Sequence, residues 1–158
     1  MNYTDSNLID QWLNTIGKQF NATFKLDSNH KCFIGTSEVA LTIYASPLHE
    51  HVYLTANLCE RVEALSIDTL RFVLTANLFL EETKGMAIAI DPIANGLVLS
   101  QRCLIQSLNF ESFQQQINSV IVTANHIQSL LQAHDNGDQA MEMSMANNGI
   151  NAINAIRI

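Results

Sequence analysis

The chain has 158 residues, a formal net charge of −7, an isoelectric point near 5.0 and only 8 basic residues. The length suits one domain, and the scattered basic residues argue against nucleic-acid binding, which needs clustered Lys and Arg. No apolar run is as long as a membrane span and no apolar segment follows Met1, so we expect a cytoplasmic protein without a secretory signal.

The first predicted element is a helix over residues 5–20. Its apolar residues recur at spacings of four, three and four and form one stripe, Ile9, Leu13, Ile16 and Phe20. Leu8 and Trp12 widen the stripe on one flank. A stripe this wide either packs on a sheet or leaves an apolar margin for a ligand, and Trp12 in such a position is more often a core residue.

Three strands are predicted next, at residues 31–36, 39–45 and 51–60. The two longer ones alternate between a strictly apolar face and a mixed face, which is typical of an antiparallel sheet with one side toward water. The link between them contains His49-Glu50-His51, the most metal-like cluster of the chain. No third ligand with a convincing spacing exists, so a solvated turn is the favoured interpretation of this link.

The central predicted element is a helix over residues 66–84. Ser66 is a plausible N-cap, and Lys84 followed by Gly85 is a stop signal, because glycine readily adopts a positive φ. The helix is apolar nearly all the way round, so it needs cover on more than one side. In a domain this small, a partner subunit is the simplest cover.

A hairpin and a last helix complete the predicted domain. Residues 86–91 alternate as a strand, Asn95-Gly96 signals a hairpin turn, and residues 97–105 return as its second strand. Asn109 caps a helix that runs to about Ala133. The remaining residues, 134–158, form a low-complexity tail in which three isoleucines could make a weak stripe against the body or a partner: Ile150, Ile153 and Ile156.

The sequence carries no catalytic or phosphate-binding motif. The paired carboxylates Glu81 and Glu82 point about 100° apart on a helix and are not poised for shared acid–base work. Three widely spaced cysteines without a CxxC pair suit a reducing compartment: Cys32, Cys59 and Cys103. We therefore expect no enzyme activity, no cofactor and no metal.

The predicted order is helix, three strands, helix, two-stranded hairpin, helix, which is an α+β fold with an antiparallel sheet packed against helices. Together with Leu-Thr-Ala-Asn-Leu-Phe at 74–79, Thr-Lys-Gly-Met-Ala-Ile-Ala-Ile-Asp at 83–91 and Leu-Val-Leu at 97–99, this order resembles the CesT (Tir chaperone) family. These proteins are the class I chaperones of bacterial type III secretion. The resemblance covers roughly residues 5–133 and is most specific over 70–99, which implies one chaperone domain at 1–133 and an extension at 134–158.

The resemblance implies a homodimer that binds the N-terminal segment of a secreted effector as an extended chain and passes it to the export ATPase. The implied dimer contacts are Leu70, Leu74, Asn77, Leu78, Leu97 and Leu99. The implied effector contacts are Leu8, Trp12, Leu13, Ile16, Phe33, Ile34, Leu41 and Ile43. Two alternatives remain, a YbjN-like cytosolic regulator of the same fold and, more distantly, a metal-dependent enzyme built on His49 and His51.

Overall fold

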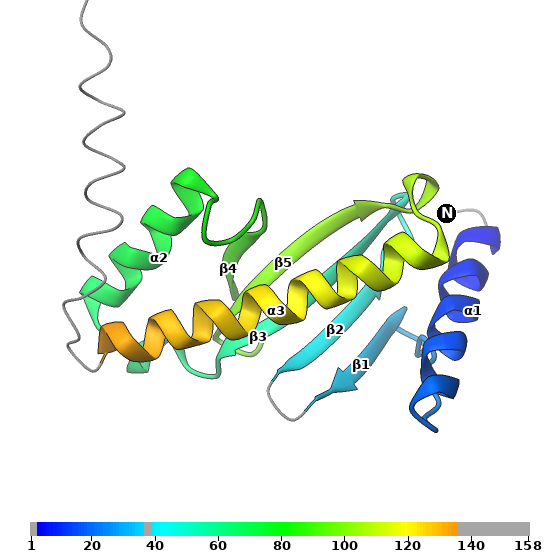
Figure 1. The fold of residues 1–158 in the computed structure, drawn as a ribbon, viewed down its shortest axis with the longest axis horizontal. Coiled ribbons are helices and arrows are strands. Elements are labelled where there is room, and N and C mark those ends of the chain that lie inside the picture. Colours follow the sequence, from blue (N-terminus) through cyan, green and yellow to red (C-terminus); the bar gives the residue numbers. More distant parts are fainter. Residues whose placement is uncertain (1–2, 37–38, 136–158) are drawn as a thin grey trace, which may run out of the picture.

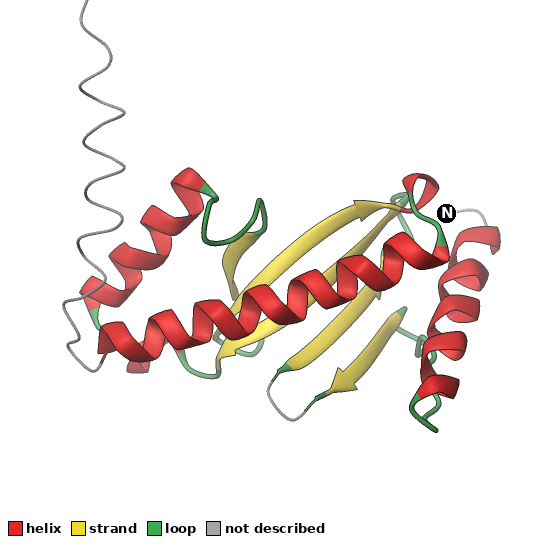
Figure 2. Cartoon of the chain, viewed as in Figure 1, coloured by secondary structure: helices red, strands yellow, loops and turns green. Residues whose placement is uncertain are grey.

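The computed structural model describes residues 3–36 and 39–135, and the predicted tail at 134–158 lies almost wholly outside them. Three helices and one five-stranded sheet make up this part of the chain (Figures 1 and 2), which confirms the predicted α+β class. The elements are α1 (Tyr3–Gln19), β1 (Lys31–Gly35), β2 (Ala40–Ala45), β3 (His51–Cys59), α2 (Ile67–Phe79), β4 (Ala87–Asp91), β5 (Gly96–Leu104) and α3 (Phe110–Asp135), with short 3₁₀ turns at Val62–Ala64 and Ile105–Ser107.

The sheet is antiparallel throughout, in the order β1-β2-β3-β5-β4. The two nine-residue strands, β3 and β5, lie at its centre, where Leu54 pairs with Gln101 and Ala56 with Leu99. The edge strands β1 and β4 have five residues each. Because the edge strands are short, most backbone N–H and C=O groups of the sheet are hydrogen-bonded to a neighbouring strand of the same sheet.

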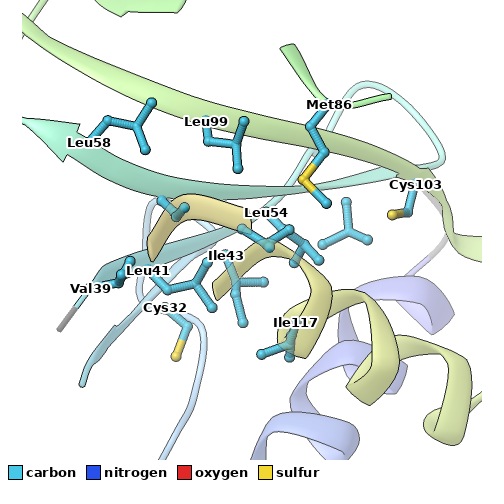
Figure 3. Close-up of a cluster of buried hydrophobic side chains, with 14 of the residues drawn as sticks. Cys32, Val39, Leu41, Ile43, Leu54, Leu58, Met86, Leu99, Cys103 and Ile117 are labelled. Atoms are coloured by element: carbon cyan, nitrogen blue, oxygen red, sulfur yellow. The ribbon is translucent and has the colours of Figure 1, made fainter. Parts of the chain in front are cut away.

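One face of the sheet carries the core, because alternate residues of every strand point to it. Figure 3 shows this layer, in which Leu41, Ile43, Leu54 and Leu99 lie on the strands and Ile117 comes from α3. The helix α3 crosses this face (Figure 1), and its Phe113 ring centroid lies 5.2 Å from that of Trp12 on α1. The helices α1 and α3 therefore cover one side of the sheet, and no element of residues 3–36 and 39–135 covers the other side.

The cap of α2 is as predicted, but its end is not. Ser66 accepts a hydrogen bond from the Thr69 N–H at 3.0 Å. The helix ends at Phe79, and Leu80 takes a left-handed conformation with φ of 57°. Lys84 and Gly85, the predicted stop signal, belong to a separate turn that leads into β4, and both have positive φ. The expected end at residue 84 was therefore wrong by five residues.

Two further expectations need correction. Phe20 was predicted to continue the apolar stripe of α1, yet the helix ends at Gln19 and the Phe20 side chain is 69% exposed. The β4–β5 connection is a four-residue turn in which Asn95 alone has the expected positive φ. Gly96 is needed there for another reason, because a Cβ at this position would lie 2.4 Å from the Cys59 carbonyl oxygen.

Candidate functional site

One apolar stripe of α2 has no cover within the described chain. Ile67, Leu74 and Leu78 recur at helical spacing with Arg71 between them, and their side chains are 70%, 68% and 73% exposed. Val73 and Ala76, on the opposite side of the helix, are buried. We call Ile67, Arg71, Leu74 and Leu78 the α2 stripe. Exposing several large apolar side chains on one helix face is typical of a protein–protein interface.

The edge of the sheet at β4 is closed by a side chain. The Asn77 amide on α2 donates to the Ile88 C=O and accepts from the Ile88 N–H, both at 2.8 Å. Next along the strand, the Met86 N–H donates to the Thr83 C=O. The outward backbone groups over this half of β4 are therefore already paired, and an added strand could not use them.

The opposite edge, at β1, is open over half its length. The outward N–H and C=O of Lys31 both pair with Asp27, through its carboxylate and its N–H. Outward and inward groups alternate along an antiparallel strand, so Phe33 and Gly35 also point their N–H and C=O away from β2. Within the described chain no hydrogen bond reaches these groups, which leaves a site where another strand can pair.

A hollow of about 410 Å³ lies on the open face of the sheet beside this edge. We call it the sheet hollow. Its lining is Lys31, Phe33, Ala40, Thr42, Tyr44, Thr55, Asn57, Glu60, Asp91, Ala94, Gly96 and Val98. Two contacts hold the Tyr44 ring in this lining. The ring stacks on Tyr53 with centroids 6.0 Å apart, and the Lys31 Nζ lies 5.9 Å from the Tyr44 centroid.

Three charged side chains line the sheet hollow: Lys31, Glu60 and Asp91. Asp91 accepts hydrogen bonds from the backbone N–H groups of Ile93 and Ala94, at 2.8 and 3.3 Å. These two bonds, the larger from Ile93, hold the pKa of Asp91 below its ordinary value. The hollow therefore combines a partly apolar floor with a carboxylate that is ionised at neutral pH.

The sequence model of the Tir chaperone protein (CesT) family matches residues 11–128. The chain belongs to this family. The matched segment runs from the middle of α1 to the last turns of α3, so it includes the whole sheet and all of α2. A comparison with curated protein sequences finds no match.

Solved structures with the same fold include chaperones bound to partners. The chain resembles a chain of the ExsC-ExsE complex with a TM-score of 0.71 and 17% identity, over 80% of this chain and 95% of that one. A chain of the HopA1-SchA chaperone-effector complex gives 0.65 and 12%, over 80% and 97%. A chain of the ExoU-SpcU complex, from the type III secretion system of Pseudomonas aeruginosa, gives 0.55 and 17%, over 78% and 93%. At these identities the likeness establishes the fold alone.

The CesT fold buries most of the residues expected to contact an effector. The structure places Trp12, Leu13, Ile16, Leu41 and Ile43 in the core. Trp12 is only 9% exposed and packs on Phe113, so the first helix offers little of its apolar stripe to a ligand. Phe33 is 66% exposed, while Leu8 and Ile34 are partly buried.

The residues expected to form the dimer contact also divide into exposed and buried ones. Leu74 and Leu78 are exposed on the α2 stripe, and Leu70 is partly buried. Leu97 and Leu99 lie in the core of their own chain. The Asn77 side chain is hydrogen-bonded to the backbone of Ile88. Sequence reasoning missed the sheet hollow, although the mixed faces of residues 39–45 and 51–60 already showed Tyr44 and Asn57 on the side away from the core.

The histidine cluster is not gathered into a metal site. His49 lies exposed in the β2–β3 turn and His51 begins β3. Over residues 3–36 and 39–135, no group of three or more potential ligands could hold a metal ion. In the same ranges no helix is long and apolar enough to cross a membrane.

Proposed function

We propose that this chain is a type III secretion chaperone that binds the N-terminal segment of a secreted effector and keeps it competent for export. Membership of the CesT family supports the class, and similar folds occur in the chaperone–effector complexes described above. The observation that carries the proposal is the open half of the β1 edge beside the sheet hollow. The β1 edge can pair with the backbone of an effector segment, and the adjacent sheet hollow can bind its apolar side chains.

The binding mode follows from these two features. An extended effector segment pairs its backbone with Phe33 and Gly35 as an added strand. Its apolar side chains lie over the exposed Phe33 ring and in the sheet hollow. Main-chain pairing is indifferent to sequence, so the side chains that enter the hollow provide the selectivity.

The effect on the effector needs no nucleotide in the chaperone. A segment that lacks a core of its own gains apolar burial and backbone pairing when it binds, and the bound fraction is withdrawn from aggregation by mass action. Catalysis has no part in this function. Release of the effector and its delivery to the export ATPase belong to the proposal and take place in the cytoplasm.

Two copies of the chain form the working unit in this proposal. The α2 stripe is the contact, because Leu74 and Leu78 expose large apolar surface on a helix that Asn77 joins to the sheet by hydrogen bonds. A homodimer through this stripe leaves both β1 edges free, since β1 and β4 are opposite edges of the sheet and α2 is clamped to β4.

Co-purification from the native host tests the function. A tagged chain should recover one or a few exported proteins, and limited proteolysis of each complex should leave an N-terminal effector fragment of tens of residues. The matched control is the same chain with Phe33→Asp, which should lose the effector while remaining folded. Recovery of only unexported regulatory proteins would favour the YbjN-like alternative and overturn the proposal.

A further inference from the structure

The sheet hollow lies at the end of the sheet toward which the last helix runs. Gln128 on α3 donates to the Asn57 C=O at 3.1 Å, and Asn57 lines the hollow from the opposite face of the sheet. From Gln128 the helix continues for about 10 Å to Asp135. The last turn of α3 lies against α2, where His134 Nδ1 is 3.3 Å from Thr69 Oγ1, so the chain that follows starts there, about 10 Å of helix beyond Gln128.

We propose that residues 150–158 of the same chain occupy the sheet hollow, where they act as an internal occupant that an effector has to displace. The displacement rests on the proposed function, whereas occupation of the hollow does not. The proposal is carried by the reach of the following segment, by its pattern of side chains and by the charges that line the hollow.

The reach is sufficient. Fourteen residues, 136–149, join α3 to the proposed occupant. Fully extended they span at most about 50 Å. The way back along the helix to Gln128 takes about 10 Å of this length, which leaves most of it for the path to the other face of the sheet. Docking of a segment of the same chain is intramolecular, so even a weak contact is favoured.

The side chains of this segment suit the floor of the hollow. It reads Ile-Asn-Ala-Ile-Asn-Ala-Ile-Arg-Ile, so isoleucines recur at every third position between small or amide side chains. The floor offers Phe33, Tyr44 and Val98 as apolar contacts, with Thr55 and Asn57 able to hydrogen-bond the amides. Burying isoleucine against such a floor is favourable in proportion to the apolar area removed from water.

The charges also match. Arg157 is the only basic residue after Arg102, apart from histidine. The lining of the hollow carries two carboxylates, Glu60 and Asp91, against one ammonium, Lys31, so a negative excess remains for Arg157 to meet. The α2 stripe, the other apolar surface near the end of α3, has Arg71 within it, and the Asp68 carboxylate beside it is already paired with Arg71 at 3.0 Å. A segment that carries Arg157 is therefore better placed in the hollow than on α2.

Backbone amide NMR signals of the full-length chain test the occupation without any effector. The variant Ile150→Ser/Ile153→Ser/Ile156→Ser should shift the signals of Thr42, Thr55 and Val98. It should leave those of Asn14 and Lys25, in the depression beside α1, unchanged. A synthetic peptide of residues 146–158 at millimolar concentration should return the shifted signals toward their original positions.

A second variant fills the hollow itself. With Val98→Lys, the amide signals around the hollow should no longer differ between the chain with the original tail and the chain with the triple-serine tail. The reason is that the lysine removes the apolar contact surface in both chains. Identical hollow signals with either tail would overturn the proposal, and so would shifts confined to Leu74 and Leu78. In either of those cases effector affinity would be the same with both tails, and the proposed function would stand unaffected. If the proposal holds, the triple-serine variant should bind the co-purified effector fragment about threefold to tenfold more tightly.

Discussion

The Asn77 side chain of α2 forms two hydrogen bonds with the backbone of Ile88 in β4, each 2.8 Å long. The amide thus takes the place of a neighbouring strand. It joins a helix to the edge of the sheet and satisfies two backbone groups that would otherwise stay unpaired. The same contact sets the direction in which the α2 stripe faces.

Asn77→Ala should destabilise the fold. It leaves the Ile88 N–H and C=O without their partner, and a polar group left unsatisfied costs about 1–3 kcal/mol. We expect the free energy of unfolding in urea to fall by about 2 kcal/mol. Asn118→Ala, at an exposed position of α3, is the control and should change it by less than about 0.5 kcal/mol. Equal stabilities of the two variants would show that Asn77 does not hold α2.

Leu74→Asp should separate the proposed dimer. The substitution would put an unpaired carboxylate into an apolar contact, at a cost of several kcal/mol. Light scattering at micromolar concentration should give a dimer for the unmodified chain and a monomer, or aggregate, for the variant. Leu48→Asp, at a leucine that is even more exposed than Leu74 but lies in the β2–β3 turn, should remain a dimer. An unmodified chain that is monomeric would refute the contact.

Trp12 and Phe33 should respond in opposite ways to truncation. Trp12 is a core residue, so Trp12→Ala should lower the free energy of unfolding by about 3–5 kcal/mol. Phe33 is exposed, so Phe33→Ala should leave stability within about 0.5 kcal/mol. Truncation of an aromatic anchor weakens binding by about 2 kcal/mol, so Phe33→Ala should weaken effector binding at least tenfold.

Melting and effector affinity measured on both of these variants provide the check. The Trp12→Ala protein, at a temperature where it is folded, should bind the effector normally. Loss of affinity in Trp12→Ala without loss of stability would place the binding site on α1 after all.

The three cysteines should be free thiols with unequal reactivity. Burial raises the pKa of Cys32 and of Cys103, while Cys59 is partly exposed. A thiol reagent at pH 8 should therefore label Cys59 first in the folded chain, and all three after denaturation. Cys32 and Cys103 ionise at lower pH in the unfolded chain, so stability should fall as the pH rises above the ordinary thiol pKa. Mass analysis that found a native disulfide would contradict this arrangement.

Periodicity was enough to predict the elements and their faces. The alternation of residues 39–45 and 51–60 correctly assigned one apolar face to each strand, and Ser66 and Asn109 correctly marked helix starts. The end of α2 was missed, because no local signal distinguishes Leu80, which adopts a left-handed conformation that leucine rarely takes.

The candidate site was harder to predict, since it depends on which faces meet. The sequence favours a core position for Trp12 but leaves a ligand contact open for it, as for Leu13 and Phe33. Only the crossing of α3 over the sheet, with Phe113 against Trp12, decides that the first two are buried and the third is not. The closure of one sheet edge by Asn77 joins residues eleven positions apart through a side chain, which no periodic pattern reports.

The open part of the β1 edge is short, and this has a mechanical consequence. Asp27 already occupies the outward groups of Lys31, so only Phe33 and Gly35 remain for pairing. A strand docked there is held by a few bonds at one spot. A pulling force directed across the strand, at one end of the docked segment, would break these bonds one after another, whereas a force along the strand would load them together. If an effector segment docks there as proposed, a small force across the strand would release it while the chaperone stays folded.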